Sequence, residues 1–210
     1  MCNWNNYTAK IQGFTATDYD LLNKTAKGVV LDVGCGLGGH LARLNTASLR
    51  VGIDPGLSGL KRGKKRFPEN IFICANAYRL PFLNDTFDTV ICIDVIEHVD
   101  QPLELLKEIK RVLKQNGLLF LQTPNYPVKR IYDFWHWVRK SRKNFRDDPT
   151  HITKLNTLSL KNHVQKSDLE VQLLKARNLP FQLSVPFKRS FLYKKLALSF
   201  AQKIILIARK

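Results

Sequence analysis

The chain contains 210 residues, with 34 Lys and Arg against 17 Asp and Glu, and its formal net charge is +17. Because 44% of the residues are hydrophobic and 24% are charged, the composition excludes a disordered tail, a collagen and a disulfide scaffold. A chain of this length buries about 70% of its unfolded surface, so residues 1–210 are predicted to form a single domain.

Strand and helix patterns alternate along the first 125 residues. The predicted strands are Val29 to Val33, Leu49 to Ile53, Ile71 to Cys74, Thr89 to Ile93 and Leu118 to Leu121. The predicted helices are Leu37 to Leu44, Leu57 to Phe67 and Leu103 to Leu113, the last opened by Pro102 and closed by Asn116-Gly117. This alternation is typical of an α/β fold with a mostly parallel sheet and helices on both faces.

A glycine-rich loop, Gly34 to Gly39, joins the first strand to the first predicted helix. Glycines let a ligand approach the backbone closely, and the amides at a helix N-terminus favour a nucleotide. Asp54 ends the second strand, where a carboxylate can bind ribose hydroxyls. On these features alone, a dinucleotide-dependent dehydrogenase fits as well as any other enzyme.

Asp32 favours a different ligand. It lies two residues before Gly34, where its charge would repel the pyrophosphate of a dinucleotide. S-adenosylmethionine has no phosphate and carries an ammonium and a sulfonium, which a carboxylate attracts. The alternative is that Asp32 only holds the amides of the loop.

Several ordered motifs resemble the class I S-adenosylmethionine-dependent methyltransferases, in particular the methyltransferase type 11 group. They are LDVGCGLGG, VGIDP, ANAYRLPF, FDTVICIDVIEHV and LLFLQTPN. The resemblance covers about residues 28–125 closely, and the rest loosely through DPTHITKL and ILIARK. It implies a Rossmann-like, seven-stranded, mostly parallel sheet with an antiparallel last strand, and S-adenosyl-L-methionine bound across the carboxyl ends of the strands.

The resemblance also implies roles for individual residues. The glycine loop would approach the methionine part of the cofactor, Asp54 would take the ribose hydroxyls, Asn76-Ala77 would flank the adenine, and Ile93-Asp94 would line the sulfonium pocket. The family usually has Asp where Asn76 stands, and an amide oxygen still accepts from the adenine amino group, so we expect weaker binding without loss. The full predicted cofactor set is Asp32, Gly34, Cys35, Gly36, Asp54, Asn76, Ala77, Ile93 and Asp94.

The part of the chain after residue 125 is strongly basic. Residues 126–210 hold 19 Lys and Arg against five Asp and Glu, whereas residues 1–125 hold 15 against 12. This asymmetry favours an anionic partner, although basic faces are often only solvated. We therefore divide the domain into a cofactor-binding core, 28–125, and a basic substrate-side region, 126–210. The latter has an insertion at about 126–150, a predicted helix at Leu155 to Gln165, and predicted strands at Leu169 to Ala176 and Ile204 to Ile207.

Two basic segments have an apolar stripe at helical spacing. In Arg130 to Arg146 the stripe is Ile131, Phe134, Trp135 and Val138, and near the C-terminus it is Leu192, Leu196 and Phe200 beside Lys194 and Lys195. Aromatic side chains next to Lys and Arg are typical of helices that lie on an anionic membrane surface. Simple packing of both stripes on the sheet is the alternative.

Methyl transfer depends mainly on positioning, but a hydroxyl acceptor also benefits from a general base. Our first candidate for this catalytic base is His151, which follows the insertion. His98 is expected at a helix start or beside the cofactor, and His136 toward substrate. His40 and His163 are expected on helix surfaces or in helix packing. No Cys, His or Asp spacing predicts a metal site.

The cysteines Cys2, Cys35, Cys74 and Cys92 form no CxxC pair and are expected to be reduced thiols. The longest apolar run, Ile204 to Ala208, is far shorter than the roughly 20 residues of a membrane span, and residues 1–10 lack the apolar core of a signal peptide. We expect a cytoplasmic protein that does not cross a bilayer and attaches to the inner membrane face through its basic segments.

The expected acceptor is a hydroxyl of a small amphiphilic or anionic molecule, such as a quinone, lipid or glycan intermediate. An RNA methyltransferase is less favoured, because the Asn/Asp-Pro-Pro-Tyr element of amino-methylating enzymes is absent after the fourth strand, which reads Ile93 to Ile96. A third hypothesis is a membrane- or RNA-associated adaptor that keeps the fold without the activity. The oligomeric state is left open.

Overall fold

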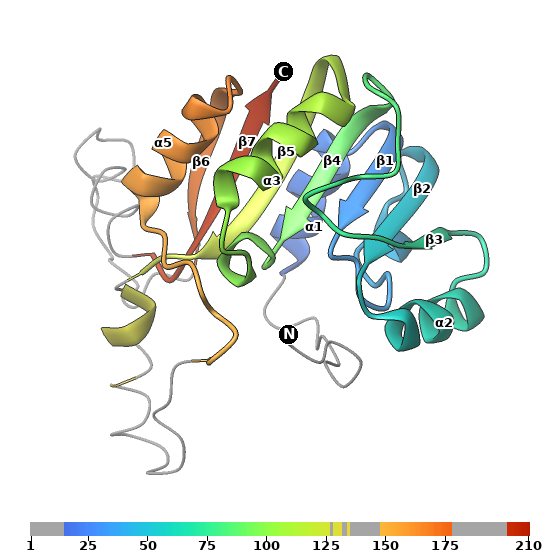
Figure 1. Cartoon of the computed structure of the whole chain (residues 1–210), viewed down its shortest axis with the longest axis horizontal. Coiled ribbons are helices and arrows are strands. Elements are labelled where there is room, and N and C mark those ends of the chain that lie inside the picture. Colours follow the sequence, from blue (N-terminus) through green and yellow to red (C-terminus); the bar gives the residue numbers. More distant parts are fainter. Residues whose placement is uncertain (1–14, 127, 132–133, 135–147, 178–200) are drawn as a thin grey trace.

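The computed structural model describes residues 15–126, 128–131, 134, 148–177 and 201–210. Within them, seven strands form one sheet in the order β3-β2-β1-β4-β5-β7-β6 (Figure 1). The strands are β1 (Gly28–Val33), β2 (Ala47–Asp54), β3 (Ile71–Cys74), β4 (Phe87–Ile93), β5 (Leu113–Pro124), β6 (Glu170–Arg177) and β7 (Lys203–Arg209). β7 runs antiparallel to both β5 and β6, while the pairs among β1 to β5 are parallel. The predicted fold is confirmed.

Helices cover both faces of the sheet. The α-helices are α1 (Ala16–Thr25), α2 (Leu57–Arg66), α3 (Pro102–Val112) and α5 (Thr157–Lys166), and the 3₁₀ helices are η2 (Leu41–Arg43) and η3 (Ile96–His98). α3 and α5 lie in front of the sheet in Figure 1, and α1 lies behind it. The sheet separates two hydrophobic clusters, and successive residues of a strand point into one or the other. On β1, Leu31 packs in the cluster that contains residues of α3 and α5, whereas Val30 packs in the cluster that contains residues of α1 and α2.

Local predictions failed at three places. The helix predicted at Leu37 to Leu44 is wrong, because this segment consists of turns followed by η2. Gly36 and Gly38 have φ angles of +52° and +73°, outside the helical region, and a Cβ on Gly38 would lie 2.5 Å from the ring of Phe72. Asn116-Gly117 does not close α3, which ends at Val112, but lies within β5. Helix α1 was not predicted at all.

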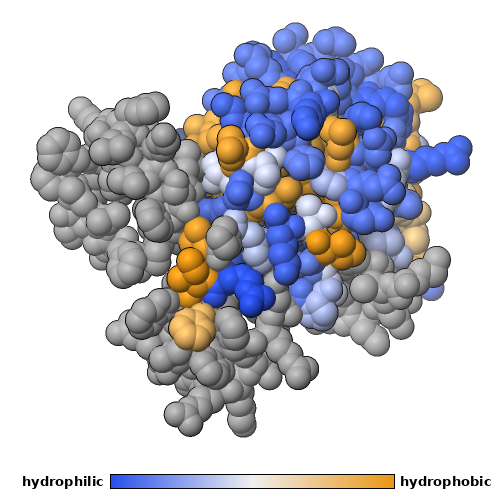
Figure 2. Space-filling model, turned by 60° about the vertical axis from the view of Figure 1, so that its left-hand side comes forward, coloured by the Kyte–Doolittle hydropathy of each residue, from blue (hydrophilic) through white to orange (hydrophobic). Residues whose placement is uncertain are grey.

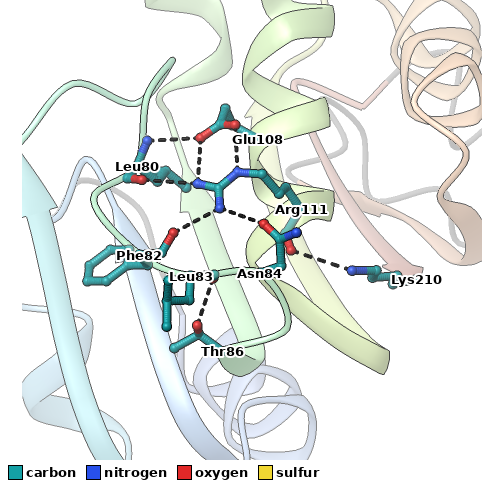
Figure 3. A network of polar contacts seen from close by, with 8 residues as sticks. All are labelled: Leu80, Phe82, Leu83, Asn84, Thr86, Glu108, Arg111 and Lys210. Atoms are coloured by element: carbon teal, nitrogen blue, oxygen red, sulfur yellow. Dashed lines mark hydrogen bonds and ion pairs between the residues drawn. The ribbon is translucent and has the colours of Figure 1, made fainter.

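Arg111, on α3, fixes the loop that follows β3 (Figure 3). Its guanidinium donates to the carbonyls of Leu80 and Phe82 at 3.0 and 2.8 Å and to Asn84 Oδ1 at 2.9 Å. Glu108 binds the same guanidinium and accepts from the Leu80 amide at 2.9 Å. The hydrogen bond from Arg111 holds the pKa of Glu108 below its ordinary value. This network anchors the segment next to the predicted adenine site.

No helix of the described residues is both long and apolar enough to span a membrane. Figure 2 shows a face on which hydrophobic residues form small patches between hydrophilic side chains. Ile131 and Phe134 of the predicted membrane stripe are exposed by 57% and 45%. The rest of that stripe, its basic cluster up to Arg146, His136, Cys2 and the C-terminal stripe lie outside the described residues.

Candidate functional site

The predicted cofactor residues gather at one edge of the sheet, the lower edge in Figure 1. The glycine loop follows β1, Asp54 ends β2, Asn76 and Ala77 follow β3, and Asp94 follows β4. Because these strands are parallel neighbours, their carboxyl ends meet there. This is the position at which doubly wound α/β sheets bind nucleotides.

The glycine loop turns sharply over the end of β2. The amides of Gly34 and Cys35 both donate to the carbonyl of Ile53, at 2.8 and 2.9 Å. Gly34 has a φ of +74°, and a Cβ there would lie 2.4 Å from Val95 Cγ2, so only glycine fits. The Cys35 side chain is buried in the core, where burial raises the pKa of the thiol. Cys35 therefore offers a ligand only its backbone.

The Asp54 carboxylate holds the glycine loop through hydrogen bonds to backbone amides. Its Oδ2 accepts from the Gly36 amide at 3.0 Å and its Oδ1 accepts from the Gly56 amide at 2.7 Å. Holding the loop amides was the alternative considered for Asp32, and the structure shows Asp54 in that position. Asp54 is only half buried, which leaves the carboxylate accessible to a ligand.

Asp32 lies beneath the loop on β1, with 2% of its surface exposed. Burial, and then the charge of Asp54, raise the pKa of Asp32 to about 8. Its Oδ2 is buried and accepts no hydrogen bond from the part of the chain that the structure describes. A buried carboxyl with an unsatisfied oxygen is stabilised by a nearby cation, so this environment fits a positively charged ligand.

The segment on the adenine side is held by its own hydrogen bonds. Asn76 is exposed, and its Oδ1 accepts from the Tyr78 amide at 2.9 Å. The oxygen has a second lone pair, so an adenine amino group can still donate to it. The Tyr78 hydroxyl donates to Asp100 at 2.5 Å and accepts from the amides of Asp100 and Gln101. Ala77, between them, is partly buried.

Asp94 adopts a φ of +52° directly after buried Ile93. Its Oδ2 pairs with Lys203 Nζ at 2.5 Å, and its amide donates to the carbonyl of Gln122 at 2.9 Å. Lys203 was missed by the sequence reasoning. It begins β7, and only the antiparallel insertion of β7 beside β5 brings it to this edge.

A buried polar chain continues from this point to α1. Arg177, at the end of β6, donates to Gln122 Oε1 at 3.1 Å and pairs with Asp18 Oδ2 at 2.7 Å. Arg177 and Asp18 are both buried. None of these three residues was predicted as part of the site, because no pattern in the sequence links α1 to β6.

His151 lies beside His98 and Glu97, which belong to η3. The two imidazole ring centroids are 4.8 Å apart, and His151 Nδ1 is hydrogen-bonded to the Tyr126 hydroxyl. Thr153 docks this segment by donating its amide to the Glu97 carbonyl at 2.9 Å. The predicted base is therefore next to the segment that follows β4, together with two groups that the sequence reasoning had not joined to it.

Glu97 is almost fully buried. Its Oε2 accepts from Thr123 Oγ1 at 3.0 Å, whereas its Oε1 is buried without a hydrogen bond to any described residue. Burial, and then the charge of Asp94, raise the pKa of Glu97 to about 8. The sequence showed Glu97 only as part of the EHV motif, and its burial and its proximity to His151 depend on the fold.

The two other histidines of the described residues, His40 and His163, lie apart from this cluster. His40 directly precedes η2, and its Nδ1 lies 3.2 Å from the Tyr19 hydroxyl oxygen. Burial lowers the pKa of His40 to about 4. The helix predicted around His40 does not form, but the contact of His40 with Tyr19 of α1 agrees with the helix-packing alternative. His163 lies on α5, as predicted, with its Nδ1 2.7 Å from the Ser159 carbonyl.

Comparison with known proteins finds a family match for part of this chain. Residues 31–121 match the methyltransferase domain family. The ubiquinone biosynthesis O-methyltransferase of Haemophilus ducreyi is 37% identical over 111 residues, which cover 48% of this chain and 47% of that protein. The tRNA U34 carboxymethyltransferase of Campylobacter curvus is 37% identical over 108 residues, which cover 49% of this chain and 36% of that protein. This chain therefore spans less than half the length of either relative.

Solved structures share the whole fold at low sequence identity. An S-adenosylmethionine-dependent methyltransferase from Mesorhizobium loti superimposes with a TM-score of 0.68 at 14% identity, covering 95% of this chain and 99% of that one. A chain from the complex of the Haloferax volcanii Trm112 methyltransferase activator with a methyltransferase superimposes with a TM-score of 0.68 at 16% identity. The superposition covers 99% of this chain and 89% of that one. Residues 31–121 therefore match a methyltransferase domain, and the described chain shares its fold with an S-adenosylmethionine-dependent methyltransferase.

Proposed function

We propose that this protein is an S-adenosylmethionine-dependent methyltransferase that methylates a hydroxyl of a small amphiphilic or anionic acceptor. The observation that carries the proposal is the pair formed by the glycine loop and Asp54 at the carboxyl edge of the sheet, within a segment that matches the methyltransferase domain. The cradle at Gly34 and the buried Asp32 carboxyl fit a cationic ligand without phosphate.

Each predicted residue has a defined task in this proposal. Asp54 accepts hydrogen bonds from the ribose hydroxyls while it keeps the loop amides in place. Asn76 and Ala77 contact the adenine, and the loop backbone, including Cys35, contacts the methionine part. Ile93 and Asp94 line the pocket around the sulfonium, and Lys203 holds the Asp94 carboxylate in one orientation.

Bound S-adenosylmethionine supplies an electrophilic methyl group, which passes in line to the acceptor oxygen while the carbon–sulfur bond breaks and its electron pair stays on sulfur. The protein then needs to hold the two reactants and to accept the hydroxyl proton. His151 is the candidate base, with its ring oriented by the Tyr126 hydroxyl and with Asp148 Oδ2 3.9 Å from its Nε2.

Replacing His151 with Gln is expected to lower kcat by about 100-fold, the lower range for loss of a general base, and to leave the affinity for S-adenosylmethionine unchanged. Single-turnover methylation and calorimetry measure the two quantities. His163→Gln is the matched control, because it removes a histidine from α5 outside the cluster. Unchanged turnover in His151→Gln would assign His151 a structural role.

The pH dependence of cofactor binding should report on Asp32. A cationic cofactor favours the ionised carboxyl, so binding releases a proton below the pKa of about 8. S-adenosylhomocysteine lacks the sulfonium charge and serves as the reference ligand. The ratio of the affinity for S-adenosylmethionine to that for S-adenosylhomocysteine should therefore rise by up to about tenfold per pH unit between pH 6 and 8. Calorimetry across this range measures the ratio. A ratio with the same slope in Asp32→Asn would contradict this assignment.

A quinone-like or lipid-linked acceptor is favoured by three observations. The relative from Haemophilus ducreyi is named for ubiquinone biosynthesis. The last 85 residues carry most of the positive charge, and Ile131 and Phe134 are exposed beside Arg130. We extend the proposal to a cytoplasmic protein that attaches to the inner membrane face, where such acceptors reside, through salt-sensitive contacts of Arg130 to Arg146 and the C-terminal Lys-rich segment.

RNA is the second candidate acceptor, supported by the relative named as a tRNA methyltransferase and by the structural neighbour in complex with Trm112. Incubating fractionated cell extract with cofactor labelled in its methyl group separates the alternatives. Label in the lipid or small-molecule pool supports the leading proposal, and label in RNA alone replaces it. Binding to vesicles or RNA with no cofactor binding would support the adaptor hypothesis.

A further inference from the structure

Glu97, His98 and His151 form a compact cluster at the carboxyl edge of the sheet. One potential ligand atom from each residue lies within 4.8 Å of those of the other two. Glu97 and His98 come from η3, and His151 comes from the segment that docks against it. His151 is far along the chain from the adjacent Glu97 and His98, which is why spacing alone predicted no metal site.

We propose that these three side chains bind one divalent metal ion of the zinc type. Two imidazole nitrogens and one carboxylate oxygen are a ligand set found in zinc sites that keep a position open for a water or a substrate. The same donors also accept other first-row divalent ions, so the metal is defined as a class and not as a single element.

The Glu97 carboxyl has one oxygen that a cation could bind. Its Oε2 accepts a hydrogen bond from Thr123, while its Oε1 is buried and has no hydrogen-bond partner among the described residues. A buried carboxylate oxygen without a partner is unfavourable by itself and becomes favourable when it coordinates a cation. The cluster therefore contains a buried carboxyl oxygen, with no hydrogen bond from the described residues, next to two imidazoles.

The hydrogen bond at His98 prepares its other nitrogen for a metal. His98 Nδ1 lies 3.0 Å from the carbonyl of Thr150. A carbonyl only accepts, so Nδ1 carries the proton and Nε2 keeps its lone pair. A second ring nitrogen that donates to a carbonyl is the usual support of a metal-binding histidine.

His151 has matching support. Its Nδ1 is hydrogen-bonded to the Tyr126 hydroxyl, and donation from Nδ1 to that oxygen leaves Nε2 as a ligand. Metal–ligand distances of about 2.0–2.2 Å bring tetrahedral ligands to within roughly 3.5 Å of one another. Since the three ligand atoms now lie within 4.8 Å of one another, metal binding requires them to move closer together.

The inference deepens the proposed function and rests on it for its catalytic meaning. A metal at this position would bind the acceptor oxygen and lower the pKa of its hydroxyl, whose proton would pass to water. His151 would then act as a metal ligand in place of a proton acceptor. Binding of the metal itself does not depend on the methyl acceptor, so it can be tested separately.

The test is titration of chelator-treated full-length protein with Zn²⁺ in a calorimeter, repeated with Co²⁺ while its visible absorption is recorded. We expect one ion per chain, and a loss of affinity of at least about tenfold in His98→Gln and in His151→Gln. His163→Gln is the matched control and should bind like the wild type. Because Glu97 is buried, Glu97→Gln is interpreted only where its melting temperature is unchanged.

Two results would overturn the proposal: equal affinity in wild type, His98→Gln and His151→Gln, or equal weakening in His163→Gln. Calorimetry with S-adenosylmethionine on the same preparations separates the two proposals. Cofactor binding without a metal site removes the present inference alone, and a metal site without cofactor binding removes the proposed function.

Discussion

Replacing Asp54 with Ala is expected to raise the dissociation constant for S-adenosylmethionine by about 100-fold. In the proposed complex the Asp54 carboxylate accepts hydrogen bonds from two ribose hydroxyls. A hydrogen bond to a charged group contributes about 1.5–3 kcal/mol to the free energy of binding. Two such bonds at the lower value amount to about 3 kcal/mol, or roughly two factors of ten. The substitution also releases the amides of Gly36 and Gly56, which increases the loss.

A graded series and a charge control make this result specific. Asp54→Asn keeps one carbonyl oxygen and should fall between the wild type and Asp54→Ala. Asp20→Ala removes an exposed carboxylate on α1 and should leave the affinity unchanged. Calorimetry gives all four values, and melting temperatures show whether the loop change affects the fold. Preference of the wild type for NADH over S-adenosylmethionine would instead support the dehydrogenase considered from the glycine pattern.

Replacing Arg177 with Met is expected to lower the free energy of unfolding by about 3–5 kcal/mol. The substitution leaves the carboxylate of Asp18 buried and deprived of its cation, and it removes a donor to Gln122. The amide and the hydroxyl of Thr15 still donate to Asp18 Oδ2, so the expected loss lies toward the lower end of the range. Urea denaturation measures the change.

The control and the compensating variant decide what causes the loss. Lys107→Met breaks the exposed pair with Glu104 and should change stability by less than about 1 kcal/mol. Asp18→Leu combined with Arg177→Met removes both buried charges and should regain most of the stability. An effect of Arg177→Met no larger than that of Lys107→Met would show that the buried pair does not stabilise the fold.

The sheet could be predicted because its strands contain apolar runs, which are largely buried in the inner strands β1, β4, β5 and β7 and only partly buried in the edge strands β3 and β6. β3 was predicted with its observed bounds, and the other strands lie within a few residues of their predictions. The failed helix after Gly34 has a local cause, since the spacing of Leu37 and Leu41 resembles a helix while the positive φ angles of Gly36 and Gly38 prevent one. Periodicity reports apolar spacing and not backbone conformation.

The site was predictable only where motif and position coincide. Asp32, Asp54 and Asp94 each end or adjoin a strand and therefore lie at the carboxyl edge. Lys203 and Arg177 reach that edge through the order of β6 and β7, which no local pattern specifies. The proximity of His151 to Glu97 likewise depends on a loop docking through Thr153.

The position of β7 has a consequence for the order of folding. β6 lies at the edge of the sheet, and its sheet partner is β7, which is made after it. During synthesis β1 to β5 can pair as soon as they emerge, but β6 cannot join them until β7 has inserted beside β5. The Asp94 partner Lys203 and the buried contacts of Arg177 form in the same event, so among the described strands β7 completes the carboxyl edge.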